Sequence, residues 1–346
     1  MSAQGQLEVF GFFQNTFSHT TRSSSQFEDE KEHNSFSRNL AIEEYLPQCA
    51  FLQAYGSFPR DRLKLDYAAA CRLTLEIVVT SIHPTATRRL TLAEQLHFTE
   101  RGFIKPLPLF AEEGVVHLQQ RFDELLGKLP DGIDINRVNC WQKANRWIYD
   151  QCCTPAVLDY VEDLVGEDFY LWGCHFFCKL PGGSSDVPWH QDAQYWPLTP
   201  RETVTVWLAV YDTDDSNGAM RVVAGSHRSG MMDHEQRQGE KFVLSQGIDE
   251  TQFDAADVVT IDLQAGQMSL HDDRLIHGSG PSVSGRRRVG LTMRFSPSQV
   301  HCDLSVWPNF EAYPMRGTDA GLNPVGKIPL GDACPTSMFQ LSSEFA

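Results

Sequence analysis

The sequence predicts an α+β fold that is mainly β: a double-stranded β-helix, also called a jelly-roll or cupin-like barrel, with helices packed on one side. Helical patterns come first along the chain, and strand patterns with a period of two residues follow after Gly166. Clusters of Gly, Pro, Asn and Asp separate these strands, and Ser216-Asn217-Gly218 is typical of a hairpin turn. Together these patterns favour two antiparallel sheets that face each other.

Three helices are expected first. Thr91 can cap the first helix, and Gly102 ends it. The second spans residues 110–129, where apolar residues recur at helical spacing, and the third spans about 155–164. Five later segments have strand character: 169–179, 203–210, 258–263, 267–271 and 288–295.

The domain organisation has two parts. With 346 residues, 41% of them hydrophobic, the chain can bury the core of one large domain, which we place at residues 89–346. Residues 1–88 form an N-terminal extension of unassigned role. Residues 23–36 in it are polar and predict a mobile segment, whereas 66–82 predict an ordered helix or strand.

Composition excludes some classes of partner. The net charge of -16 disfavours nucleic acid and anionic membranes as partners, and its simplest interpretation is solubility. The nine cysteines include no Cys-x-x-Cys pair, and the N-terminus lacks a signal-peptide pattern. These features predict a cytoplasmic protein with reduced thiols. They leave the oligomeric state open.

A metal site is predicted by His190 and Asp192. On an extended strand, residues two apart project to the same face, so Gln191 would point away. His277 follows 85 positions after Asp192, a separation that can return the chain to an adjacent strand. Two imidazoles and one carboxylate on one face of an octahedron suit iron(II), and they leave positions for a 2-oxo acid and O2.

A competing His-x-Asp motif lies at His271 and Asp273. His277 follows it too closely to be its distal ligand, and the residues directly after His301, CDLSVWPNF, contain no arginine. We therefore expect His271 and Asp273 to form hydrogen bonds in a turn before His277.

The strand at 288–295 carries candidates for an anion site. Arg288 and Arg294 share its polar face, and a guanidinium can bind a 2-oxo acid's distal carboxylate through two hydrogen bonds. Arg287 points to the other face and fits a solvated turn. Trp207, in the strand at 203–210, could line the same pocket or belong to the core.

Four stretches together resemble the phytanoyl-CoA dioxygenase family of iron(II)/2-oxoglutarate oxygenases. They are LTLAEQLHFTERGFIKPLPLF, WHQDAQYWPLTPRETVTVWLAV, NGAMRVVAGSH and LHDDRLIHGSGPSVSGRRRVGLTMRF. The resemblance covers roughly residues 89 to 300, and several ordered motifs are more specific than His-x-Asp alone.

The resemblance implies particular site residues. His190, Asp192 and His277 would be the Fe(II) ligands. The 2-oxoglutarate contacts would be Arg288, Ser279, Trp207 and His175. Because Asp192 keeps the carboxylate, hydroxylation is favoured over halogenation.

The function that the resemblance implies is hydroxylation of an unactivated C–H bond of a small-molecule substrate, with release of succinate and CO2. Desaturation, epoxidation or ring closure in secondary metabolism, and a non-catalytic metal-binding or small-molecule-binding jelly roll, are the alternatives. Eight further residues are candidates for a substrate pocket: Gln142, Lys143, Asn145, Arg146, Trp189, Gln194, Tyr195 and Trp196.

Overall fold

The computed structural model describes residues 89–181, 186–236, 244 and 246–335, and the expected extension, residues 1–88, lies outside them. Two antiparallel sheets organise the described part. The six-stranded sheet has the order β1 (Phe103–Pro108), β10 (Gln267–Asp272), β5 (Val204–Ala209), β12 (Arg288–Pro297), β2 (Phe169–Lys179) and β14 (Tyr313–Arg316). The four-stranded sheet has the order β3 (Val187–His190), β11 (His277–Ser279), β6 (Met220–Val223) and β9 (Val258–Ile261).

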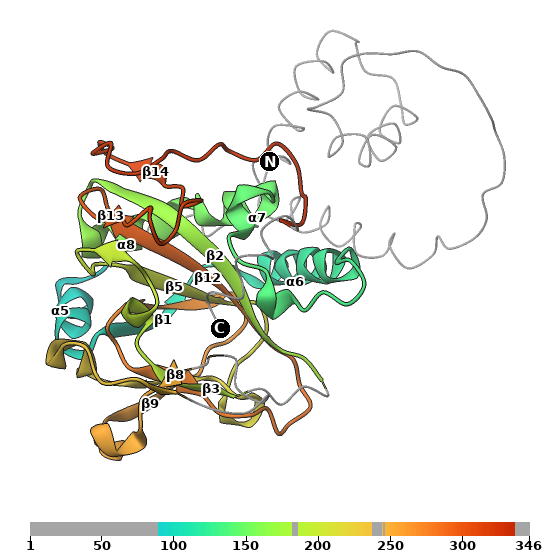
Figure 1. The fold of residues 1–346 in the computed structure, drawn as a ribbon. Coiled ribbons are helices and arrows are strands. Elements are labelled where there is room, and N and C mark those ends of the chain that lie inside the picture. The colour runs from blue at the N-terminus through green and yellow to red at the C-terminus, as the bar shows by residue number, and fades with distance from the viewer. Residues whose placement is uncertain (1–88, 182–185, 237–243, 245, 336–346) are drawn as a thin grey trace, which may run out of the picture. The chain divides into compact units, whose positions relative to one another are not determined.

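The mainly β jelly-roll prediction is confirmed, with one qualification. In Figure 1, β3 and β9 lie below β1, β5 and β12, so that the smaller sheet faces one side of the larger. No strand of one sheet pairs with a strand of the other in the described ranges, so the two sheets do not close into a barrel. Two short pairs complete the strands: β4 (Leu198–Thr199) with β13 (His301–Cys302), and β7 (Glu235–Gln236) with β8 (Gln246–Gly247).

The predicted helices form at the expected places. Thr91 and Glu94 make a reciprocal capping box at the start of α5 (Leu92–Arg101), and Gly102 ends it with a φ of 81°. The other α-helices are α6 (Glu112–Gly127), α7 (Arg146–Cys152), which the sequence did not predict, and α8 (Pro155–Val165). Short 3-10 turns are η2 (Ile135–Arg137), η3 (Trp141–Lys143), η4 (Asp192–Gln194), η5 (Asp215–Asn217), η6 (Ser226–Ser229), η7 (Glu250–Gln252) and η8 (Ala255–Asp257).

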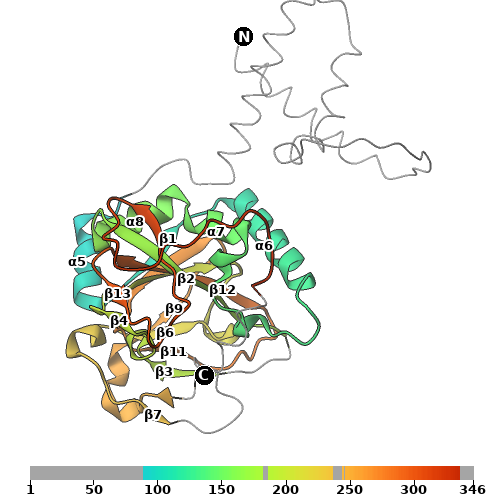
Figure 2. The ribbon, with the colours of Figure 1, turned by 45° about the horizontal axis from the view of Figure 1, so that its top comes forward.

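Helices α6, α7 and α8 cover the outer face of the six-stranded sheet (Figures 1 and 2). Alternate residues of β12 are fully buried against them in one apolar core: Val289, Leu291, Met293 and Phe295. The inner face of the same sheet is turned toward the four-stranded sheet, and this face carries the candidate site.

The hairpin predicted at Ser216-Asn217-Gly218 is wrong, although the turn itself is present. The segment forms η5 and Gly218 with a φ of 74°, but it connects β5 to β6, which belong to different sheets. The turn therefore carries the chain across from the larger sheet to the smaller one. Among the described residues, no helix is long and apolar enough to cross a membrane.

Candidate active site

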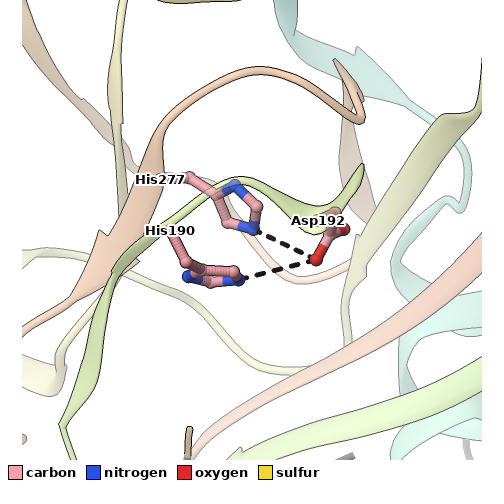
Figure 3. Close-up of side chains that lie close together, drawn as sticks. All are labelled: His190, Asp192 and His277. Carbon is pink, nitrogen blue, oxygen red and sulfur yellow. Dashed lines mark ion pairs between the residues drawn. The ribbon is translucent and has the colours of Figure 1, made fainter. Parts of the chain in front are cut away.

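Two histidines and an aspartate from different segments meet between the sheets (Figure 3). His190 Nε2 lies 3.5 Å from Asp192 Oδ1, and His277 Nε2 lies 3.8 Å from the same oxygen. One ligand atom from each residue lies within 4.8 Å of the other two, and all three residues are buried. The structure thus brings together the three side chains expected to hold a metal.

Strand pairing and a tight turn position this triad. His190 is the last residue of β3 and pairs directly with His277 of β11. The strand does not continue to Asp192 as expected, because η4 begins there, but Gln191 between them keeps an extended backbone. The buried Gln191 amide points away from the triad, donates to the carbonyls of Gly230 and Arg274, and so anchors the turn.

Backbone carbonyls fix the orientation of both imidazoles. His190 Nδ1 lies 2.8 Å from the Pro188 oxygen, and His277 Nδ1 lies 2.9 Å from the Leu275 oxygen. A carbonyl only accepts hydrogen bonds, so each Nδ1 carries the proton and each Nε2 keeps its lone pair. Both lone pairs are therefore available to a cation beside Asp192.

The charges of the triad also suit a metal. Burial raises the pKa of Asp192, but His277, His190 and His271 outweigh this effect and hold the pKa well below its usual range. Burial, followed by the neighbouring His190, lowers the pKa of His277 well below its usual value. At neutral pH the site thus presents an anionic carboxylate and a neutral His277, which is the protonation state that binds metals.

A second group of side chains surrounds Arg288 at the start of β12. The buried guanidinium donates to the carbonyls of Gly218 and Phe177, at 2.9 and 3.3 Å, and it forms no ion pair with a carboxylate of the described residues. Its Cζ atom lies 5.5 Å from the ring centre of Trp207. Ser279 ends β11 two residues after His277, and its buried hydroxyl has no hydrogen-bond partner.

Gly290 leaves room for the indole ring of Trp207. A Cβ atom on Gly290 would come within 2.0 Å of Trp207 Cζ2, so the indole lies directly over this residue of β12. Trp207 thus lies on the inner face beside Arg288, rather than among the side chains that pack against the helices.

Lys179 is a basic residue that the sequence analysis did not assign to the site. It pairs with Arg288 across β2 and β12, and its ammonium group donates to the carbonyl of Gly280 next to Ser279. Burial, and then the charge of Arg288, lowers the pKa of Lys179 to about 7. Strand parity could have found it, because His175, an expected site residue, lies four positions earlier on the same face.

His175 lies on the inner face of β2, opposite Thr292 of β12. Its Nδ1 lies 3.1 Å from the Val138 oxygen, and its ring packs against Phe177. Burial, and then the charge of Arg294, lowers the pKa of His175 to about 3, so this imidazole is neutral.

The prediction for His271 is wrong, whereas that for Asp273 is confirmed. His271 lies within β10, not in a turn, and its Nε2 lies 3.9 Å from Asp192 Oδ2. Both of its buried ring nitrogens lack hydrogen-bond partners. Asp273 does lie in the turn, where its carboxylate accepts from the Thr203 amide; burial, and then Asp272, raises its pKa to about 8.

Most of the candidates for a substrate pocket have structural roles instead. The buried Gln142 bridges the backbone of Trp172 and Cys174, and Asn145 caps α7. Lys143 and Arg146 form ion pairs with Glu311 and Asp150. Trp189 packs against Phe253 and donates a hydrogen bond to Glu250, and Gln194 is exposed. Tyr195 and Trp196 remain beside the site, since the Tyr195 ring lies 5.9 Å from that of His190 and Trp196 is buried in the adjoining loop.

The inner face fits an iron ion and an anionic co-substrate. Two imidazole nitrogens and one carboxylate form a donor set suited to iron(II) with open positions. A buried guanidinium without a carboxylate partner is costly unless a ligand supplies one, and the unpaired Ser279 hydroxyl can donate to the same ligand.

Comparison with known proteins gives the same indication. The model of the phytanoyl-CoA dioxygenase family matches residues 98–290. A probable alpha-ketoglutarate-dependent hypophosphite dioxygenase of Stutzerimonas stutzeri is 26% identical over 54% of this chain and 66% of its own length. The peroxisomal phytanoyl-CoA dioxygenase of Bos taurus is 23% identical over 61% of this chain and 70% of its own length. The chain thus spans about two thirds of these relatives.

Solved structures share the fold. The non-heme monooxygenase ThoJ, in its apo form, superimposes with a TM-score of 0.58 and 26% identity, over 72% of this chain and 94% of its own. CytC3 with Fe(II) and alpha-ketoglutarate has a TM-score of 0.55 and 20% identity, over 71% of this chain and 96% of its own.

Proposed function

This chain belongs to the phytanoyl-CoA dioxygenase family, and from that premise we propose that it hydroxylates an unactivated C–H bond of a small-molecule substrate. It is a non-haem iron(II)- and 2-oxoglutarate-dependent dioxygenase rather than a non-catalytic binding protein. The observation that carries the proposed chemistry is the meeting of His190, Asp192 and His277, with both Nε2 lone pairs directed at the carboxylate.

We assign the metal ligands to these three residues. His190 and His277 would bind through Nε2, because their Nδ1 protons are held by backbone carbonyls. Asp192 would supply the anionic oxygen, and Gln191 positions it through the turn that its amide anchors. Bound iron(II), with 2-oxoglutarate and O2, supplies the oxidising power for C–H cleavage, and the co-substrate leaves as succinate and CO2.

We assign the distal carboxylate of 2-oxoglutarate to Arg288 and Ser279. Arg288 would bind it through its guanidinium, and Ser279 would donate its unpaired hydroxyl proton. Trp207 would form the wall that keeps water from this end of the pocket, and His175 would line the pocket as a neutral imidazole. Lys179, beside Arg288, would add positive charge once a carboxylate has bound.

Hydroxylation is proposed over halogenation because Asp192 keeps the carboxylate ligand, whereas desaturation, epoxidation and ring closure would use the same triad and are the alternative outcomes. Mass spectrometry of the product distinguishes these outcomes. We further propose a cytoplasmic location without nucleic acid or membrane partners, a proposal that rests on the acidic net charge of -16 and on the absence of a Cys-x-x-Cys pair from the sequence.

The decisive experiment is an anaerobic titration of the iron(II)-loaded protein with 2-oxoglutarate. We expect a weak visible charge-transfer band as the co-substrate chelates the metal. The band should be absent from Asp192→Ala, and Arg288→Met should require far more 2-oxoglutarate to reach it. A wild-type protein that binds iron(II) but never shows the band would contradict the assignment. Succinate release can then screen candidate substrates.

A further inference from the structure

Arg294 is a second arginine on the inner face of β12, six residues after Arg288. It pairs with Thr205 of β5 on one side and with Gly173 of β2 on the other. A Cβ atom on Gly173 would lie 3.6 Å from the Arg294 side chain, so the arginine extends across this glycine. Arg294 therefore lies in the space between the sheets, at the end of β12 away from Arg288.

Two tryptophans hold the guanidinium. Its Cζ atom lies 5.0 Å from the ring centre of Trp196 and 5.6 Å from that of Trp172. The two indoles meet edge to face with their centres 4.7 Å apart. Trp196 comes four residues after Asp192, so the loop that carries the proposed metal ligand also covers Arg294. The two rings are inclined by 80°, so the planar guanidinium can stack on one of them at most, and its N–H donors remain available to a ligand.

No carboxylate neutralises Arg294. Its buried Nε has no hydrogen-bond partner, and no acidic side chain of the described residues forms an ion pair with it. The preceding Arg286 and Arg287 differ, because they pair with Asp214 and Asp123 at 2.5 Å on the surface. An arginine held rigidly in a partly buried place without an anion is suited to bind one from outside the chain.

A row of unpaired polar groups leads from Arg294 to the proposed metal site. In register across β12, β5 and β10 lie Arg294, Thr205 and His271. The Arg294 Nε, the Thr205 hydroxyl and both His271 ring nitrogens are all buried without partners. His271 Nε2 ends the row 3.9 Å from Asp192 Oδ2. The charge of Arg294 also contributes to the low pKa values of Asp192 and His175, which agrees with this proximity.

We propose that the substrate carries an oxyanion, a carboxylate or a phosphoryl group, and that Arg294 binds this group beside Trp172 and Trp196. The substrate then lies along the row formed by Arg294, Thr205 and His271, with its reacting carbon toward the metal site. This inference rests on the proposed function and gives the substrate's chemical class. Arg288 would thus bind the anionic co-substrate near one end of β12, and Arg294 would bind the anionic substrate near the other.

The test compares three ligands with the same six-carbon length and different head groups: hexanoate, hexyl phosphate and the neutral hexanamide. Calorimetry under anaerobic conditions measures their binding to the iron(II)-loaded protein saturated with 2-oxoglutarate, so that Arg288 is already occupied. We expect at least one anion to bind about tenfold to a hundredfold more tightly than hexanamide. The better of the two anions identifies the head group.

Variants test whether Arg294 causes the preference for anions over hexanamide. Arg294→Gln should reduce it to within about twofold, and Arg294→Lys should retain part of it, because a point charge replaces the planar fork. Arg287→Gln, which removes an exposed arginine at the start of the same segment, should leave the preference unchanged. Equal binding of all three ligands to the wild-type protein overturns the proposal, whether or not the variants fold. So does an anion preference that survives in a folded Arg294→Gln.

Failure of this inference and failure of the proposed function are distinguishable. The charge-transfer band formed by 2-oxoglutarate should be the same in the wild type and in Arg294→Gln, because Arg294 lies away from Arg288. If the band is absent from the wild type, the proposed function fails. If the band is present but the anion preference is missing, only the assignment of Arg294 is wrong.

Discussion

The two faces of β12 obey different physical rules. On the outer face, Val289, Leu291, Met293 and Phe295 have no exposed area and pack with the helices in one dry core. On the inner face, Arg288 and Arg294 are cations without carboxylate partners in the described part of the chain. One face of this strand is thus entirely apolar, whereas the other carries two arginines that lack a carboxylate partner.

This contrast separates stability from function within a single strand. The outer face contributes free energy of folding by removing apolar area from water. The inner face costs free energy, because the guanidinium charges lose water without gaining a carboxylate partner, and Arg294 Nε gains no hydrogen bond. Such a cost is reasonable where ligands supply the missing partners, so substitutions on the two faces should have opposite signatures.

The largest expected effect is the loss of turnover when the proposed metal site between the sheets is changed. Asp192→Ala removes the proposed anionic ligand, and turnover, measured by succinate release, should fall about a thousandfold or more. The melting temperature should change little, because no apolar packing is lost. Asp262→Ala, which removes an exposed carboxylate at the end of β9, is the matched control and should turn over normally. Full turnover by an iron-loaded Asp192→Ala would refute the ligand assignment.

The second largest effect is a loss of stability when the outer face of β12 is changed. Leu291→Ala leaves a cavity between β12 and the helices, so the free energy of unfolding should fall by about 2–5 kcal/mol. Denaturant unfolding measures this loss. The protein that stays folded should bind 2-oxoglutarate as the wild type does. A variant that loses 2-oxoglutarate binding without losing stability would show that the two faces are not independent.

Arg288→Met tests the inner face of β12 at the first residue of the strand. Loss of two charge-assisted hydrogen bonds should raise the KM for 2-oxoglutarate about tenfold to a hundredfold. Stability should hold or rise, because an uncompensated buried charge is removed. Arg287→Gln supplies the control on the exposed side, with an unchanged KM. An unchanged KM in Arg288→Met would place the co-substrate elsewhere.

The smallest effect concerns Lys179 and pH. Its folded pKa of about 7 lies below its usual value of 10.5, so the unfolded chain binds more protons between these two values. Stability due to this group therefore rises with pH above 7, by at most about 1.4 kcal/mol per pH unit. Lys179→Met should remove that slope. Urea unfolding at pH 7.5 and 8.5 measures it, and identical slopes in both proteins would contradict the prediction.

Local sequence pattern predicted much of the fold. The capping residues around α5 and the period of two in β2, β10 and β12 gave the element type and nearly the correct ends. The local pattern failed to predict connections that depend on contacts between distant segments. The turn at 216–218 has the residues of a hairpin but joins two different sheets, because local turn chemistry does not determine which sheet the next strand will join.

The site was predictable to a similar degree. Residue types and spacing, together with the family resemblance, singled out His190, Asp192 and His277, and the structure brings them together. The neighbours Asp272 and Asp273 predict a turn at His271, but this residue lies within β10. Lys179 was missed, because only its pairing with Arg288 shows that two cations share one pocket.

By itself, the sequence determined which residues alternate on each strand and which side chains could bind iron and a 2-oxo acid. These properties follow from backbone geometry and side-chain chemistry within a few neighbouring residues. Only the tertiary structure decided that His190 pairs with His277 and that Arg294 lies in register with Thr205 and His271. Such contacts join segments distant along the chain, and they form because whole faces must be buried together, a requirement that no local pattern records.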